Sequence, residues 1–296
     1  MPDPAHTRTA PGLAGLARPS GGFAMLALDQ RESLRAMFAE QTGGPVADEV
    51  LTRFKVDATR VLSPHASAVL IDRQFALDAV LAEGVLAPGC GLIAAADEFT
   101  AAPGEIVAES AIDRAVVPAD LRAAGAAALK LLLIWRPGED PERRLATAVE
   151  FTGMCRAAGL ASILEPVSRA PRDGRPWDWD AGVLAAAREL GSAGADLYKA
   201  EVPLHAQGSD TEIRRRCEQL TALIASPWVV LSSGVPPGQF PRAVALACQS
   251  GASGFLAGRA VWRSVLGRAD LDEALRAVAV PALRRLADIV DEHVPR

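Results

Sequence analysis

The chain has 296 residues, of which half are hydrophobic and 23% are charged, and its formal net charge is −5 at pH 7. The length suffices for one large α/β domain or two small ones. The acidic balance argues against nucleic acid as the main partner, because phosphate backbones are bound by strongly basic surfaces. No apolar run reaches the roughly 20 residues that cross a bilayer, and the N-terminus lacks the apolar core of a signal peptide, so we expect a cytoplasmic protein with no membrane partner.

The residue types that hold metals and form disulfides are sparse and scattered. The four cysteines form no CxxC pair, which is typical of reduced, structural thiols. The four histidines have neither HxH nor HExxH spacing. We therefore expect neither a metal nor a cofactor.

In chain order, the first segment is residues 1–19, which is rich in Pro, Gly and Ala and is expected to form a mobile arm with one short helical turn. Short apolar runs typical of strands then recur about every 33 residues, the length of one βα unit. These runs are residues 23–29, 66–72, 91–97, 128–135, 160–167, 195–203, 228–234 and 254–259. The segments between them carry apolar residues at spacings of three and four, which predicts amphipathic helices.

Eight such units predict an α/β fold, a single-domain (β/α)8 TIM barrel over residues 20–296. The near-continuous apolar strands indicate a parallel sheet covered on both faces. No GxGxxG follows the first strand, which argues against a dinucleotide-binding fold. The amphipathic residues 271–294 are expected to form the closing helices.

The predicted strands end in polar residues, at the end of a barrel where enzymes of this fold carry their chemistry. Asp72 and Asp97 are interpreted as helix caps or loop anchors, because Asp commonly caps a helix that follows a strand. The polar residues at these ends are Asp29, Gln30, Asp72, Asp97, Glu98, Glu165, Glu201, Ser232, Ser233, Gly234, Gly258 and Arg259.

Lysine is rare in this chain: it stands only at positions 55, 130 and 199, and arginine supplies the positive charge elsewhere. Because side chains alternate along a strand, Lys199 and Glu201 share the face that points into the barrel. The same argument places Lys130 in the lumen, and Glu165 ends the strand between them, so we expect these four residues to converge. An ion-pair network that fixes strand register is the alternative, but such a buried network gains little stability over apolar packing.

An amine in such a pocket has a characteristic reaction. A lysine beside another cation, in a partly dry site, has a lowered pKa and is nucleophilic when neutral. It attacks a ketone or aldehyde to form an iminium, which labilises a neighbouring carbon–carbon bond. We interpret Lys199 as the nucleophile and Lys130 as the neighbour that lowers its pKa.

A second cluster follows the last two strands. Small residues at Ser232, Ser233, Gly234 and Gly258 let the backbone approach an anion, and Arg259 can bind it with two hydrogen bonds. The alternative is that the glycines serve only tight strand–helix turns. Together with the arginine they predict an anion site.

The tracts SGGFAMLALDQRE, LKLLLIWR, SILEPV, GADLYKAEVP, PWVVLSSGV and GASGFLAGRAVW resemble the class I tagatose-bisphosphate and sulfofructosephosphate aldolases. The resemblance covers about residues 20 to 292, and SGGFAML, GADLYK and FLAGRAVW are closer to the sulfofructosephosphate branch. It implies that Lys199 forms a Schiff base and that Glu165 transfers the proton, with Lys130 and Asp29 beside it. It also implies that Gln30 contacts substrate hydroxyls.

The reaction implied is reversible cleavage of 6-deoxy-6-sulfofructose 1-phosphate to dihydroxyacetone phosphate and 3-sulfolactaldehyde, by a homo-oligomer without a metal. Arg31 and Arg169 are candidates for a second anion pocket, and Glu201 for a further substrate contact. Three alternatives stay open: cleavage of tagatose or fructose 1,6-bisphosphate, a catalytically silent barrel that senses a metabolite, and a phosphate-binding isomerase or epimerase.

Overall fold

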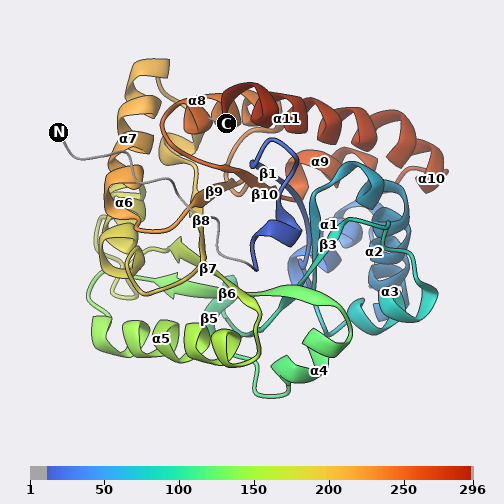
Figure 1. Ribbon diagram of the computed structural model, residues 1–296, viewed down its shortest axis with the longest axis horizontal. Helices are drawn as coiled ribbons and strands as arrows, with labels where there is room; N and C mark the ends of the chain where they lie inside the picture. The colour runs from blue at the N-terminus through green and yellow to red at the C-terminus, as the bar shows by residue number, and fades with distance from the viewer. Residues whose placement is uncertain (1–11, 295–296) are drawn as a thin grey trace.

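The computed structural model describes residues 12–294, which form a closed barrel of eight parallel strands within a ring of helices (Figure 1). This confirms the predicted TIM barrel. The strand order around the barrel is β1-β10-β9-β8-β7-β6-β3-β2. All eight predicted strands are present: β1 (Phe23–Leu28), β2 (Ala68–Ile71), β3 (Gly91–Ala95), β6 (Ala126–Trp135), β7 (Ala161–Ser168), β8 (Leu197–Glu201), β9 (Trp228–Leu231) and β10 (Gly254–Ala257).

Helices follow most barrel strands, and residues 271–294 close the ring as expected, through α10, a π-helical stretch and α11. The α-helices are α1 (Glu32–Thr42), α2 (Asp48–Leu62), α3 (Leu77–Glu83), α4 (Pro118–Ala123), α5 (Pro141–Ala157), α6 (Trp179–Leu190), α7 (Asp210–Leu223), α8 (Phe240–Gln249), α9 (Arg259–Trp262), α10 (Leu271–Ala274) and α11 (Val280–His293).

Two apolar cores hold the barrel. The larger lies between the strands and the surrounding helices, and the smaller fills the floor of the lumen. Leu13 precedes a 3-10 turn at Ala14–Leu16, and Leu13 and Leu16 are fully buried in the floor. Residues 1–11 of the predicted arm lie outside the described residues, whereas the arm from residue 12 on packs against the barrel.

Strand β8 shows how alternation positions the site. Leu197 belongs to the floor of the lumen, whereas Tyr198 and Ala200 pack in the outer core. The Cα partner of Leu197 on β7 is Ile163, also a floor residue. Lys199 and Glu165, each two residues further on, therefore stand one layer above the floor, toward the C-terminal mouth.

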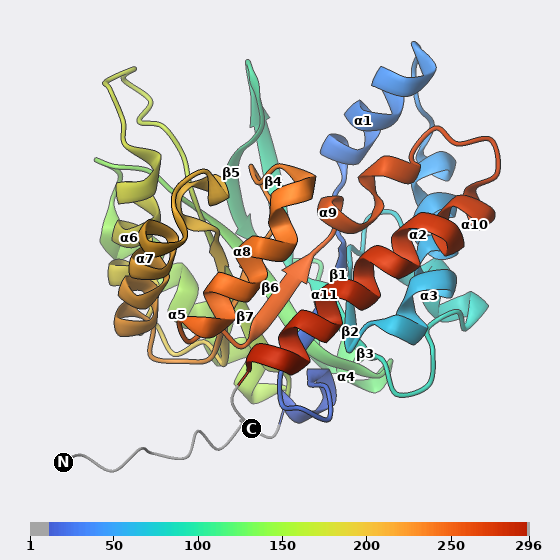
Figure 2. The same cartoon turned by 90° about the horizontal axis from the view of Figure 1, so that it is seen from above.

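An antiparallel hairpin, β4 (Asp97–Ala102) and β5 (Glu105–Ile112), rises from the end of β3 and was not predicted (Figure 2). Its turn uses Gly104 at φ 80°, a left-handed conformation that suits glycine. The sequence carried a signal for it, since Pro103-Gly104 separates two short runs. The hairpin forms one wall of the space above the barrel.

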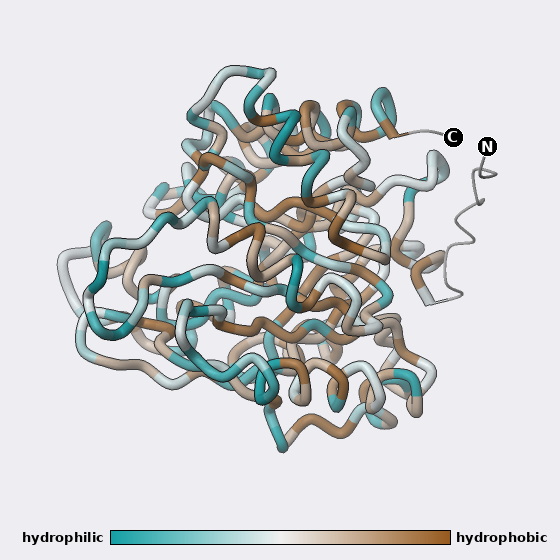
Figure 3. The backbone as a smooth tube through the Cα atoms, turned by 90° about the vertical axis from the view of Figure 1, so that its left-hand side faces the viewer, coloured by the Kyte–Doolittle hydropathy of each residue, from teal (hydrophilic) through white to brown (hydrophobic). Residues whose placement is uncertain are grey.

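Hydrophobic segments run through the interior, and hydrophilic ones gather in the outer loops (Figure 3). Within residues 12–294, no helix combines the length and apolar character needed to cross a bilayer.

Candidate active site

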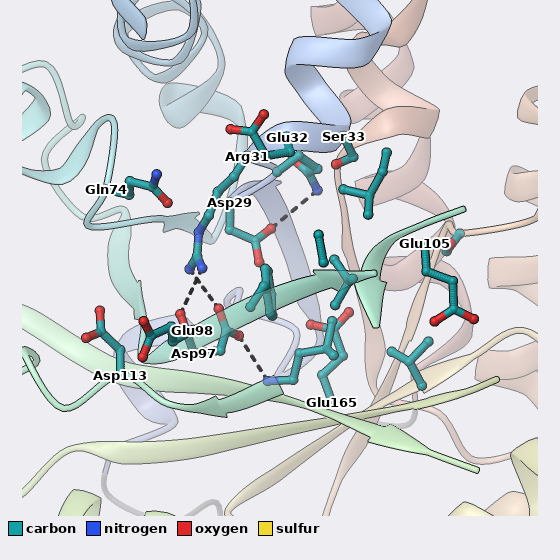
Figure 4. A pocket seen from close by; sticks show the side chains of 18 of the residues that line it. Asp29, Arg31, Glu32, Ser33, Gln74, Asp97, Glu98, Glu105, Asp113 and Glu165 are labelled. Atoms are coloured by element: carbon teal, nitrogen blue, oxygen red, sulfur yellow. Dashed lines mark hydrogen bonds and ion pairs between the residues drawn. The ribbon is translucent and has the colours of Figure 1, made fainter. Parts of the chain in front are cut away.

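A cavity of about 1000 Å³ opens at the C-terminal mouth of the barrel, between the strand ends and the β4–β5 hairpin (Figure 4). Its walls carry many ionisable side chains. The predicted site residues that line it are Asp29, Gln30, Arg31, Glu165, Arg169, Lys199, Ser233 and Arg259.

Glu165 joins the two lumenal lysines. Its Oε2 atom lies 2.9 Å from Nζ of Lys199 and 3.2 Å from Nζ of Lys130. The two ammonium nitrogens are therefore no more than about 6 Å apart. All three side chains are at least nine-tenths buried. The predicted convergence of these three residues is present.

Lys130 is surrounded by carboxylates. Its Nζ lies 2.5 Å from Asp29, 2.8 Å from Asp97 and 3.2 Å from Glu165. Burial alone would lower the pKa of Lys130, but these three carboxylates raise it well above its ordinary value. Burial likewise opposes ionisation of Asp29, yet Lys130, Lys199 and Arg31 hold the pKa of Asp29 well below its usual range. Lys130 is thus a fixed charge.

Asp97 belongs to this network, although its place in the sequence predicted only a helix cap or loop anchor. It accepts the backbone N–H of Leu132 at 3.0 Å, as an anchor would, but it also pairs with Lys130 and with Arg31, the latter at 2.8 Å. Arg31 additionally donates to the Asp97 carbonyl and lies over the ring of Phe99. The guanidinium predicted for a second anion pocket is therefore committed to Asp97. Asp72, the other residue interpreted as a cap or loop anchor, is a loop anchor: it accepts the Phe75 N–H at 2.8 Å, whereas the N-cap of α3 is Ala76.

The predicted anion site follows β9 and β10. Arg259 donates to Oγ of Ser233 at 2.6 Å, and among residues 12–294 no carboxylate lies within 4.0 Å of its guanidinium. Burial and the neighbouring cations Arg263 and Arg169 lower the pKa of Arg259. Among residues 12–294 this partly buried cation has no carboxylate in direct contact, which suits an anionic ligand.

The glycines of these loops are required by their neighbours. Gly234 has φ 75°, and a Cβ there would lie 2.2 Å from the His205 ring. A Cβ at Gly258 would lie 2.2 Å from the Ala27 carbonyl oxygen. Ser232 is buried, and its hydroxyl donates no hydrogen bond to another of the described residues.

His205 is not among the site residues predicted from the sequence. It lies in a turn, Pro203–Ala206, in which Leu204, His205 and Ala206 all have positive φ. Such backbone strain in residues other than glycine is concentrated at functional sites. The imidazole stacks on Trp179, with ring centroids 3.6 Å apart, and the same ring lies close to Gly234. A histidine so close to the end of β8 was visible in the sequence, but its contact with Gly234 was not.

Glu201 does not join the lysines, and the predicted fourfold convergence is wrong in this respect. Its Oε2 accepts the Ser168 N–H at 2.7 Å, and its Oε1 lies 3.8 Å from Arg169. Burial raises the pKa of Glu201 to about 7 despite these partners. Gln30 lines the cavity as expected and donates to Asp29 at 3.3 Å, while its Oε1 is buried with no hydrogen-bond partner among the described residues.

Comparison with known families gives one match that spans most of the chain. Residues 23–264 match the model of the family described as DeoC/LacD family aldolase. The matched range contains every strand of the barrel and every predicted site residue.

Two similar curated proteins are aldolases. The chain is 28% identical over 295 residues to the tagatose 1,6-diphosphate aldolase of Listeria monocytogenes serotype 4a (strain HCC23), covering 90% of this chain and 85% of the relative. It is 28% identical over 271 residues to tagatose 1,6-diphosphate aldolase 1 of Streptococcus pyogenes serotype M3 (strain SSI-1), covering 82% and 81%.

Solved structures support the fold. An archaeal fructose-1,6-bisphosphate aldolase, whose catalytic lysine is covalently bound to a carbinolamine intermediate, has a TM-score of 0.62 at 15% identity, covering 95% of this chain and 98% of its own. The fructose-bisphosphate aldolase of Slackia heliotrinireducens DSM 20476 has a TM-score of 0.65 at 17% identity, covering 94% and 90%.

Proposed function

The chain belongs to the DeoC/LacD family of aldolases, and from this premise we propose that it is a Schiff-base aldolase that uses Lys199 to cleave a ketose 1-phosphate between C3 and C4. The observation that carries the proposal is the position of Glu165, whose Oε2 atom contacts both lumenal lysines in one buried cluster. An amine nucleophile and a proton carrier at hydrogen-bond distance are the two groups that this reaction needs.

Lys199 is the nucleophile because it lines the cavity, whereas Lys130 is fully buried behind three carboxylates. The neutral amine of Lys199 attacks the C2 carbonyl, and loss of water from the resulting carbinolamine leaves an iminium. The fixed charge of Lys130 pairs with Asp29 and Glu165 and holds both carboxylates in place.

Glu165 moves the proton in the cleavage step. Its carboxylate takes the proton of the C4 hydroxyl as the C3–C4 bond breaks, and the electron pair of that bond flows into the iminium to form an enamine. The aldehyde made from C4 to C6 leaves. The enamine then accepts a proton at C3, and hydrolysis releases dihydroxyacetone phosphate and restores Lys199. Asp29, ionised beside Lys130, is the second carboxylate at this face.

Arg259 and Ser233 are assigned to the phosphate on C1. That phosphate is one carbon from the carbon that Lys199 attacks, so its site must adjoin the catalytic cluster. Arg259 does, because Glu165 and Asp29 are among the charges that act on its pKa. Because Gly234 and Gly258 have no Cβ, their loops pack closely against His205 and Ala27 at this end of the barrel.

The identity of the sugar is a finer proposal. The sequence tracts favour 6-deoxy-6-sulfofructose 1-phosphate, whereas the similar curated proteins bear the name tagatose 1,6-diphosphate aldolase. A homo-oligomer without a metal, and a division between an arm and a barrel at residue 20, are likewise predictions. An intact Lys130, Glu165 and Lys199 cluster argues against a silent sensor, and an isomerase would not need a lumenal amine.

Borohydride trapping tests the Schiff base. Incubation with dihydroxyacetone phosphate and borohydride should inactivate the enzyme irreversibly, whereas borohydride alone should not. The same reaction should proceed in EDTA. Loss of activity on chelation that zinc restores, or full activity after borohydride treatment with the ketose, would contradict a metal-independent Schiff-base mechanism.

A further inference from the structure

The cations that line the cavity are unevenly neutralised. Four of the five have a carboxylate within 4.0 Å, and Arg259 alone has none among residues 12–294. The pairs are Arg31 with Asp97, Arg73 with Asp113, Arg169 with Glu201, and Lys199 with Glu165. The cavity therefore offers one unneutralised cation.

Arg169 has the longest of these four ion pairs, and its charge acts on Arg259. Arg169 is 3.8 Å from Glu201, beyond hydrogen-bond distance, and about a third of its side chain is exposed. Arg169 is among the charges that lower the pKa of Arg259, so the two guanidiniums repel each other across the same part of the cavity. One anion between them would relieve this repulsion. Both arginines line the same cavity, which favours one shared anion site over a second site at Arg169.

The opposite side of the cavity is acidic. In the closed barrel, β2 stands four strands from β8 in either direction, and β3 stands four strands from β9. The residues after β3 therefore lie across the mouth from Ser233, which follows β9, and those after β2 and β3 lie two or three strands from Arg259 and Arg169, which follow β10 and β7. The residues after β2 and β3 place five carboxylates and one arginine on the cavity wall: Asp78, Asp97, Glu98, Glu105, Asp113 and Arg73.

Among the described residues, the charges on this wall disfavour a second phosphate. Arg73 pairs with Asp113 at 2.7 Å, and neither Asp78 nor Glu98 has an ion-pair partner among the described residues. Figure 4 places Glu98 and Asp113 beside the Arg31–Asp97 pair, with Gln74 on the same side. An anionic group here would meet like charges, whereas hydroxyl groups could donate to the carboxylates and to Gln74.

We propose that the cavity selects ketose 1-phosphates whose C6 end is an uncharged, hydroxylated carbon, so that the aldehyde released is a neutral hydroxyaldehyde. This inference rests on the proposed function, because it takes C1 to lie at Arg259 and the C4–C6 portion to point across the barrel. It differs from both bisphosphate and sulfosugar cleavage in the charge of the far end. Glu98 and Asp78 are its specificity-determining residues.

The proposal orders the substrates by the charge on C6. A hydroxyl is neutral, a sulfonate carries one negative charge, and a phosphate monoester carries nearly two at pH 7. We expect kcat/KM to fall in that order for fructose 1-phosphate, 6-deoxy-6-sulfofructose 1-phosphate and fructose 1,6-bisphosphate, with at least about tenfold between the first and the last. Tagatose 1-phosphate and tagatose 1,6-bisphosphate provide the same comparison in the other C4 configuration.

A charge reversal on the far wall sharpens the test. Glu98→Lys should raise kcat/KM for the bisphosphate relative to the monophosphate about fivefold, the scale of one partly exposed ion pair. Glu218→Lys is the matched control, since Glu218 is exposed on α7, outside the cavity, and gives the same change in net charge. It should leave that ratio unchanged.

Trapping by dihydroxyacetone phosphate separates this inference from the proposed function. The three-carbon ketose has no far end, so it should be trapped by borohydride whatever the C6 preference. Two outcomes would overturn only the inference of an uncharged C6 end. One is trapping together with equal or higher kcat/KM on a bisphosphate. The other is a ratio of bisphosphate to monophosphate kcat/KM that responds equally to Glu98→Lys and Glu218→Lys. Absence of trapping would overturn both this inference and the proposed function.

Discussion

Lys199 and Glu165 form an ion pair of 2.9 Å inside the barrel, between neighbouring strands. This contact holds the carboxylate assigned to the cleavage step against the amine that forms the iminium. The same oxygen of Glu165 also meets Lys130 at 3.2 Å, whose charge is held by Asp29 and Asp97 as well. One carboxylate, Glu165, thus contacts both the fixed cation Lys130 and the reactive amine of Lys199.

Borohydride reduction in the presence of dihydroxyacetone phosphate should attach the adduct to Lys199. Peptide mass mapping locates it, and Lys199→Ala should abolish both the adduct and the cleavage activity, because alanine has no amine to form an iminium. An adduct on Lys130, with Lys199 unmodified, would reverse the two assignments.

Glu165→Gln should slow carbon–carbon cleavage by roughly 100-fold or more, because the amide keeps the shape of the side chain but cannot take the C4 proton. Trapping of dihydroxyacetone phosphate should fall much less, since Lys199 and the anion site remain. Single-turnover cleavage and borohydride trapping measure the two steps separately. Unchanged turnover would assign the proton transfer to Asp29.

Arg259→Ala should lower kcat/KM by about 30-fold or more, equal to about 2 kcal/mol, because a charged hydrogen-bonding partner of the phosphate is removed. Arg285→Ala removes an exposed arginine from α11 and serves as the control of equal charge. Comparable kinetics for the two variants would mean that Arg259 does not hold the phosphate.

Glu201 should make folding stability depend on pH. Its pKa is raised by burial to about 7, so the folded protein binds a proton that the unfolded chain releases at its ordinary value near 4.5. The corresponding stability is fully present below that unfolded value and is lost as the pH rises through about 7.

Relative to Glu201→Gln, the wild-type protein should therefore lose up to about 3 kcal/mol of unfolding free energy between pH 5 and pH 8. Urea unfolding at several pH values measures this. Curves for the two proteins that stay parallel across the range would show that Glu201 keeps an ordinary pKa in the fold.

Periodicity in the sequence was enough for the architecture. The apolar runs predicted all eight strands, because a strand buried on both faces must be apolar along most of its length. Alternation then identified the lumen face of β8, and the rarity of lysine singled out Lys130 and Lys199. These inferences depend on residues close in the chain or on adjacent strands, and residue spacing in the sequence predicts such relationships.

Relationships between residues on opposite sides of the barrel cannot be predicted from the sequence in this way. Asp97 reads as an ordinary cap until the fold places it between Lys130 and Arg31, and Glu201 shares a face with Lys199 yet turns to Ser168 and Arg169. The charge of a pocket is likewise a sum over residues distant in the chain, such as Arg73 and Asp113. Composition and spacing determined what kind of groups this protein carries, whereas only tertiary structure decided which of them are neutralised, because Coulomb energies depend on distance in space and on burial.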